Sequence, residues 1–151
     1  MTTATAPRLQ AHLRPAKDAY DYEYFRARLA NPDLADTGVS IVLSRAPLLA
    51  VPTGGARRGG YMSYDQVVLA LAVRRLLNGR PGFTDLRVLW SPYLDTCHVV
   101  EWGERSPPWW VGDEAFGRFY GYSEAAIAAH LRQQSQTPSS ASSVPYYPTA
   151  M

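Results

Sequence analysis

The segment "SYDQVVLALAVRRLLNGRPG", residues 63–82, has the most regular pattern in the chain and decides the fold class. Ser63 and Gln66 have the spacing of a helix capping box. The residues "NGRPG", 78–82, then supply a glycine and a proline, which commonly end a helix. Between these limits, apolar residues recur at helical spacing along one broad face: Val68, Leu69, Ala72, Val73, Leu76 and Leu77. The segment therefore predicts a central helix that buries this face in a core.

Short apolar runs on both sides of this helix predict strands. "VSIVL" (39–43) and "PLLAV" (47–51) precede the helix and are separated by a few turn-forming residues. "LRVLW" (86–90) and "CHVVEW" (97–102) follow it. Because a short turn-rich linker joins the second two runs, we expect them to form an antiparallel pair.

Two further helices complete the expected fold. The first is predicted from Asp18 to the Asn-Pro pair at 31–32, because a residue before proline disfavours helix. The last is predicted to begin at Ser123 and to fade after Arg132. The expected order is α-β-β-α-β-β-α. It predicts an α+β fold in which a small antiparallel sheet of about four strands packs against three helices.

The length of 151 residues is that of one domain, which we place at residues 18–133. Residues 1–17 contain basic but no acidic side chains and are predicted to be a flexible basic arm. Their arginine and threonine content also allows a transit peptide. Residues 134–151 are uncharged and rich in serine and proline, which predicts a flexible tail.

Composition narrows the function classes. Cys97 is the single cysteine, so the chain forms no internal disulfide and no cysteine cluster for zinc, which favours the cytoplasm. The longest apolar run, residues 67–73, is far shorter than the roughly 20 residues of a membrane span. We therefore expect no membrane partner, and no motif indicates a metal or another cofactor. The net charge of +2 does not by itself indicate nucleic acid.

The first candidate site is the glycine-rich stretch "VPTGGARRGGYMSYDQ", residues 51–66. Glycine-rich turns that precede a helix bind anions through backbone N–H groups, and Arg57 and Arg58 would add positive charge. Glycine and tyrosine at 60–61 stand where a nucleotide-binding P-loop needs lysine and a hydroxyl residue. The stretch is therefore either a binding loop for a phosphate- or carboxylate-bearing partner or an ordinary tight turn with two solvated arginines.

The second candidate site is "ERSPPWWVGDEAFGRFYGYS", residues 104–123. Tryptophan, tyrosine and arginine are the preferred anchors of protein interfaces, which makes Trp109, Trp110, Arg118 and Tyr120 candidate binding residues. The same rings are suited to stacking nucleic-acid bases. In a small domain, aromatic side chains also close the core beneath a loop.

A third stretch, "DTCHVVEWGE" (95–104), carries the residues of a catalytic alternative. Asp95, His98 and Glu101 would serve a small hydrolase or transferase if a distant residue completed the site. Side chains alternate between faces along a strand, so Cys97 shares a face with Glu101 and not with its neighbour His98. Cys97 and His98 therefore do not form a nucleophile and base within the strand.

Three stretches carry a resemblance to known sequences: "GGARRGGYMS" (54–63), "WSPYLDTCHVVEWGE" (90–104) and "GRFYGYSEAAI" (117–127). Together they resemble a family of small actinobacterial proteins without an assigned function, over most of residues 18–132. The resemblance implies a single compact domain of cytoplasmic origin, and it transfers no catalytic residue.

These observations favour a non-enzymatic binding or regulatory module. Its expected contact surface combines the loop 54–60 with the aromatic segment 104–122, and its expected partner is a protein. The enzyme built on Asp95, His98 and Glu101 stays an alternative. So does nucleic-acid binding through the basic arm and the arginines.

Overall fold

The structure is a computed structural model that describes residues 11–43, 46–93 and 95–136. Its elements, in chain order, are β1 (His12–Pro15), the 3-10 helix η1 (Ala16–Asp18), α1 (Tyr22–Arg28), α2 (Asp33–Asp36), β2 (Val39–Val42), β3 (Leu48–Ala50), β4 (Gly59–Tyr64), α3 (Val67–Leu77), β5 (Arg87–Leu89), β6 (His98–Gly103), the 3-10 helix η2 (Trp109–Val111), α4 (Asp113–Phe119) and α5 (Glu124–Gln136). The predicted α+β class is confirmed.

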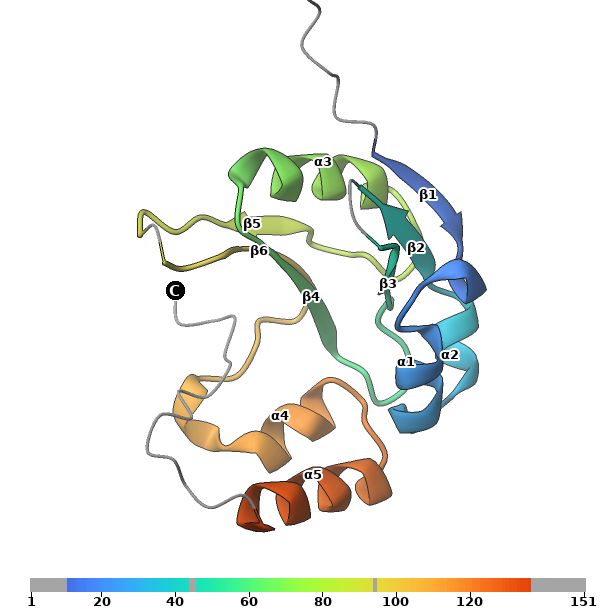
Figure 1. The fold of residues 1–151 in the computed structure, drawn as a ribbon, viewed down its shortest axis with the longest axis vertical. Helices are drawn as coiled ribbons and strands as arrows, with labels where there is room; N and C mark the ends of the chain where they lie inside the picture. The colour runs from blue at the N-terminus through green and yellow to red at the C-terminus, as the bar shows by residue number, and fades with distance from the viewer. Residues whose placement is uncertain (1–10, 44–45, 94, 137–151) are drawn as a thin grey trace, which may run out of the picture.

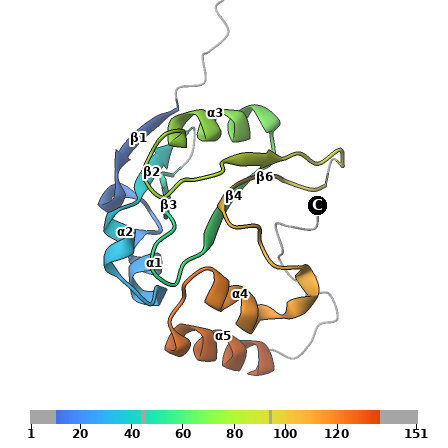
Figure 2. The ribbon, with the colours of Figure 1, turned by 180° about the vertical axis from the view of Figure 1, so that it is seen from behind.

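The strands form two antiparallel sheets in place of the expected single one. In the described residues, one three-stranded sheet has the order β1-β2-β3 and the other the order β4-β6-β5. Figure 1 shows α3 above the sheets, α1 and α2 beside the first sheet, and α4 and α5 below β4. Figure 2 shows the same layers from behind. The second sheet therefore lies between α3 on one side and the α4–α5 pair on the other.

The glycine-rich stretch forms a strand, which corrects the predicted start of the central helix. Gly59 to Tyr64 pair with β6 in antiparallel register, and Ser63 lies opposite Val99. The helix α3 begins after Gln66, whose extended backbone carries no side-chain cap. The prediction that Ser63 caps this helix was therefore wrong. The backbone N–H and C=O groups of residues 59–64 form hydrogen bonds with the edge of β6 instead of starting a helical turn.

The main core lies between α3 and the two sheets. Val73 and Leu77 of the predicted apolar face are buried on α3, together with Ala70, which was not part of that face, whereas Val68 of the predicted face is 52% exposed. They pack in one cluster with Val100 and Trp102 of β6 and with residues of the first sheet. The buried stripe of α3, which is narrower than the predicted face and shifted from it, therefore joins the two sheets, and burial of its apolar area is the main stabilising term.

The N-terminal part of the described chain corrects the predicted arm. Residues 12–15, which were assigned to a flexible segment, pair with β2 from His12↔Val42 to Pro15↔Val39. A strand of four residues that contains proline has little signal of its own, and the free edge of β2 provides its partner. The first helix is also shorter than predicted, since α1 spans only Tyr22–Arg28. Residues 1–10 lie outside the described residues.

The last helix, α5, starts where it was predicted to start and extends beyond its predicted end. Ser123 caps α5, because its Oγ accepts a hydrogen bond from the Ala126 backbone N–H at 3.1 Å. The helix continues to Gln136 and so includes the first residues of the predicted tail, whose residues 137–151 lie outside the description. The helix α4, which was not predicted, falls inside the aromatic segment 104–122. Within the described ranges, no helix has the length and hydropathy needed to cross a membrane.

A substitution at Gly60 tests the close approach between β4 and β6. A Cβ at Gly60 would lie 2.5 Å from the indole of the buried Trp102, so Gly60→Ala is expected to lower the free energy of unfolding. Overpacking of this kind costs about 1–3 kcal/mol. Gly54→Ala is the control, because its Cβ would meet only the movable terminal methyl group of Leu34. Urea denaturation measures both, and equal midpoints would contradict this packing.

Candidate functional site

Arg57 leaves the glycine-rich loop pointing into the protein. The loop closes tightly, because Gly54 and Arg57 exchange two backbone hydrogen bonds of 3.0 and 2.9 Å. Gly55 at the turn has a φ of 53°, which glycine adopts without strain. Only 5% of Arg57 is exposed, so the turn places a guanidinium in the interior.

The Arg57 guanidinium has neutral partners only. Nη1 donates to the Tyr120 carbonyl at 2.9 Å, and Nε donates to the Val51 carbonyl at 3.4 Å. Its carbon lies 5.7 Å from the centre of the Tyr120 ring and 6.0 Å from that of Phe25. Burial lowers the pKa of Arg57, an effect opposed by the neighbouring tyrosines including Tyr122. An arginine still keeps its proton, so the interior holds a positive charge that no described carboxylate neutralises.

Arg57 lines a cleft between the sheet and the C-terminal helices. The cleft has a volume of about 820 Å³. Residues of α1 and β3 form one side, β4 contributes the middle, and α4 and α5 form the other side. Aromatic side chains of α1, β4, α4 and the α4–α5 connection line it: Tyr24, Phe25, Tyr61, Tyr64, Phe116, Tyr120 and Tyr122. The cleft is therefore mainly apolar, with hydroxyl groups at the ends of its rings.

Two features of the lining are chemically distinctive. Burial raises the pKa of Tyr64, Tyr120 and Tyr122, so these hydroxyls stay protonated and add no negative charge near neutral pH. The Oγ of Ser63 is buried and has no hydrogen-bond partner among the described residues. An unsatisfied buried hydroxyl is costly, so Ser63 would gain a hydrogen bond by turning its side chain toward a polar atom in the cleft.

The carboxylates that line the cleft already have partners. Asp21 accepts a hydrogen bond of 2.7 Å from the Leu49 backbone N–H, and its burial raises its pKa. Asp113 lies 3.1 Å from His130 and also contacts Gln134. These interactions hold both acids on the walls of the cleft.

The six predicted binding residues separate into an inner and an outer group. Arg57 and Tyr120 line the cleft. The neighbouring Arg58 is exposed and forms a two-pronged pair with Glu104 at 2.5 and 2.8 Å. Arg118 is likewise exposed and lies 2.7 Å from one glutamate and 3.1 Å from another. The positive charges of these two surface arginines are thus balanced locally.

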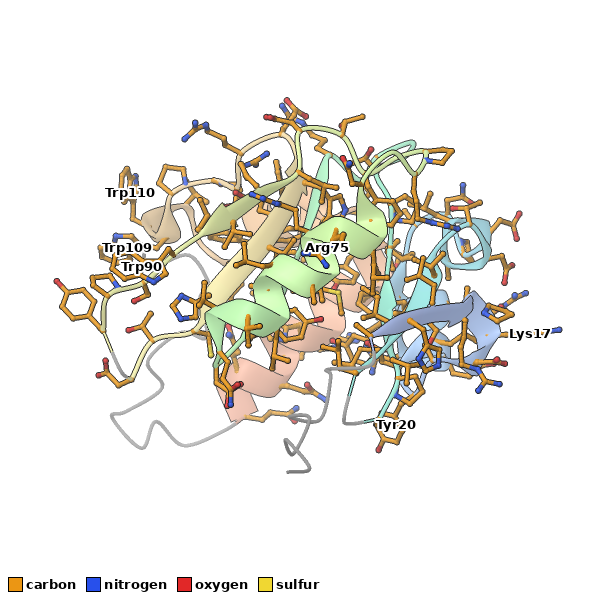
Figure 3. All side chains as sticks on the ribbon, turned by 90° about the horizontal axis from the view of Figure 1, so that it is seen from above. Lys17, Tyr20, Arg75, Trp90, Trp109 and Trp110 are labelled. Carbon is orange, nitrogen blue, oxygen red and sulfur yellow. The ribbon has the colours of Figure 1, made fainter. Side chains whose placement is uncertain are left out.

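The tryptophan pair belongs to the outer group. Trp109 is 59% exposed and Trp110 is 69% exposed. Their rings meet edge to face with centres 5.9 Å apart. Figure 3 shows both side chains at the edge of the molecule, on the same side as Trp90. These residues therefore do not close the core, and the cleft is lined by other aromatic side chains of the same segment.

The structure gives the predicted catalytic residues separate structural contacts. His98 Nδ1 accepts a hydrogen bond from the Ser91 backbone at 3.1 Å, and its ring stacks on Trp90. Glu101 is buried, pairs with Arg87 at 3.0 Å and accepts the Ser106 N–H at 3.0 Å. His98 and Glu101 are an odd number of positions apart on β6, so their side chains leave opposite faces.

Asp95 is exposed, and its carboxylate contacts only the adjacent Thr96 hydroxyl among the described hydrogen bonds, at 3.4 Å. Cys97 is also exposed. In the described part of the chain, no three histidine, cysteine or acidic residues are placed to hold a metal ion. The catalytic residues suggested by the sequence are therefore not assembled into one site.

Sequence reasoning named Arg57 and Tyr120 but missed the cleft that joins them. Phe25 lies within the first predicted helix, which the sequence did not connect with a site, and Ser63 was predicted only as a helix cap. Besides Leu48 and Leu49 of β3, the cleft is built from three segments far apart in the chain, near residues 21–28, 57–64 and 113–133. The one available signal was the density of tyrosine in all three segments.

The adjacent arginines provide a matched pair of substitutions. Arg57→Ala removes the donors to the Val51 and Tyr120 carbonyls and is expected to lower the free energy of unfolding by about 2–4 kcal/mol. Arg58→Ala breaks only an exposed ion pair and should leave the denaturation midpoint almost unchanged. Urea denaturation at low and high salt checks both, and a larger loss for Arg58→Ala would refute this assignment.

Comparisons with known proteins identify a family and no individual relative. No match to the chain was found among curated proteins or among solved structures. The model of DUF6302, described as a family of unknown function, matches residues 13–150. This match confirms the resemblance to a family without an assigned function. The chain belongs to the DUF6302 family.

Proposed function

We propose that the protein is a non-enzymatic binding module that encloses a small, mainly apolar molecule in the cleft. The observation that carries this proposal is the aromatic lining of a cleft of about 820 Å³. Small-molecule sites commonly have about 300–1,000 Å³, mostly apolar walls and a few polar groups. The cleft combines the arginine of the glycine-rich loop with the rings of the aromatic segment, so the two predicted binding regions contribute to one concave site.

Catalysis is the weaker alternative. Glu101 is engaged by Arg87 and the Ser106 N–H, and His98 by the Ser91 N–H, so neither side chain has the exposed, mutually oriented geometry of an acid and base.

Nucleic-acid binding is also less favoured. Arg58 and Arg118 are paired with glutamates and Arg57 is buried, so these arginines give no unbalanced basic surface.

The tryptophan pair supports a second function, contact with a protein partner. Trp109 and Trp110 are large, exposed and adjacent, and tryptophan is among the residues most often found at the energetic centre of interfaces. We propose that a regulatory partner docks here, and that the protein acts in the cytoplasm, as its single cysteine favours.

The cleft proposal is tested with Nile red, an uncharged dye that fluoresces strongly in apolar surroundings. Ala129 lines the cleft, whereas Ala128 is an exposed neighbour on the same helix and does not line it. Ala129→Trp is expected to fill the cleft and to reduce Nile red fluorescence severalfold. Ala128→Trp should leave the fluorescence unchanged. Equal fluorescence for wild type and both variants would show that the dye does not occupy the cleft.

The docking proposal is tested by copurification of tagged protein from native cells. The double variant Trp109→Ala, Trp110→Ala is expected to lose the partner while keeping the thermal midpoint of the wild type, because both rings are exposed. Tyr20→Ala is the matched control, since Tyr20 is 83% exposed and lies on the opposite side of the molecule from the pair (Figure 3). Retention of the same partner by the double variant would refute docking at this pair.

A further inference from the structure

We propose that the ligand of the cleft is an aromatic monocarboxylate, whose carboxylate binds the Arg57 guanidinium and whose ring lies among the tyrosine side chains. This inference rests on the proposed function, because it names the chemical class of the molecule that the cleft holds. Three observations carry it: a buried positive charge, aromatic walls around that charge, and an unsatisfied hydroxyl further along the cleft.

The first observation is the electrostatic state of Arg57. A buried cation is expensive unless it is paired, and the described partners of this guanidinium are two carbonyl groups and the Tyr122 hydroxyl. A guanidinium has five N–H donors, so these contacts leave donors for a further acceptor. An anion in the cleft would satisfy both the charge and the remaining donors.

The shape of the donor group favours a carboxylate over other anions. A guanidinium is planar and matches the two oxygens of a carboxylate with two parallel hydrogen bonds. Phosphate carries more charge and is commonly bound by several donors at once. Arg28 is the other arginine that lines the cleft, but it is exposed and stacks on the Tyr24 ring at 3.9 Å. A single buried arginine therefore indicates a planar monoanion.

The second observation is the set of rings beside Arg57. Tyr120 and Phe25 lie within cation–π distance of the guanidinium, and Tyr61 meets Tyr120 edge to face with ring centres 5.2 Å apart. A ligand ring next to its own carboxylate would contact these faces and edges in the geometries that aromatic pairs prefer. The apolar part of the ligand is therefore expected to be aromatic.

The third observation is Ser63, which offers a second polar contact. Ser63 and Tyr61 are two positions apart on β4 and so share one face of the strand, about 7 Å apart. The buried Ser63 Oγ has no described partner. A polar substituent on the far side of the ligand ring would reach this hydroxyl once the Ser63 side chain turns toward the cleft, while the carboxylate stays at Arg57.

The acidic residues that line the cleft do not oppose a ligand whose carboxylate lies at Arg57. Asp21 is bonded to the Leu49 N–H, and Asp113 is paired with His130 on the helical wall. Both acids therefore have local partners, whereas the charge of Arg57 has none among the described acids.

The test compares naphthoate with naphthamide, two flat probes that differ mainly in charge, by their displacement of Nile red from the wild-type protein. Naphthoate is expected to compete about ten-fold or more better, as charge-assisted hydrogen bonds are stronger than neutral ones. Equal competition overturns the carboxylate assignment and leaves the apolar cleft in place. Stronger competition by naphthyl phosphate also overturns it. If Nile red, naphthoate and naphthamide all fail to bind, the proposed cleft function is refuted together with this inference.

Variants of three arginines show which guanidinium binds the carboxylate of naphthoate. Arg57→Lys keeps the charge but loses the planar fork, and it is expected to reduce the preference for naphthoate severalfold if it folds. Arg28→Ala removes the exposed arginine of the cleft and should keep the preference. Loss of the preference in Arg28→Ala would place the anion on Arg28 and overturn the proposal. Arg58→Ala serves as a control for general surface charge, since Arg58 does not line this cleft.

Discussion

The indole of Trp102 in β6 links the second sheet to the chain that leaves the first sheet. Its ring lies against Gly60 across the β4–β6 pair, and only 1% of the residue is exposed. Its Nε1 donates to the Val51 carbonyl at 3.0 Å, just beyond the end of β3. It also meets the Phe83 ring edge to face, with ring centres 5.1 Å apart. One side chain of the second sheet thus fixes the chain that leaves the first sheet, and glycine at 60 is required because any Cβ would enter the space of the ring.

The same carbonyl connects the core with the cleft. Val51 accepts from Trp102 on the core side and from Arg57 Nε at 3.4 Å on the other side. Arg57 continues this link to the Tyr120 carbonyl, which lies between α4 and α5. The position of the C-terminal helices therefore depends on a buried arginine, and the cleft is the space that this arrangement leaves between the helices and β4.

Arg57 and Arg58 show how neighbouring residues of one type acquire different roles. Arg58 is exposed and paired with Glu104, so water and salt screen its charge. Arg57 is buried among carbonyls and rings, where a charge interacts over longer distances. A pattern of two arginines between glycines does not separate these outcomes. The tight turn at Gly54 and Gly55 decides which guanidinium points inward.

The sequence by itself determined the elements whose signals are local. The helix α3, the strands β2, β3, β5 and β6, and the cap of α5 at Ser123 follow from side-chain periodicity and capping, which act within a few residues. The tertiary structure decided the rest. β1 and β4 are strands because β2 and β6 offer them edges, and residues 59–60 lack the side chains that give a strand its pattern. The cleft depends on contacts between segments near residues 25, 60 and 120, and such contacts arise only when the chain has folded.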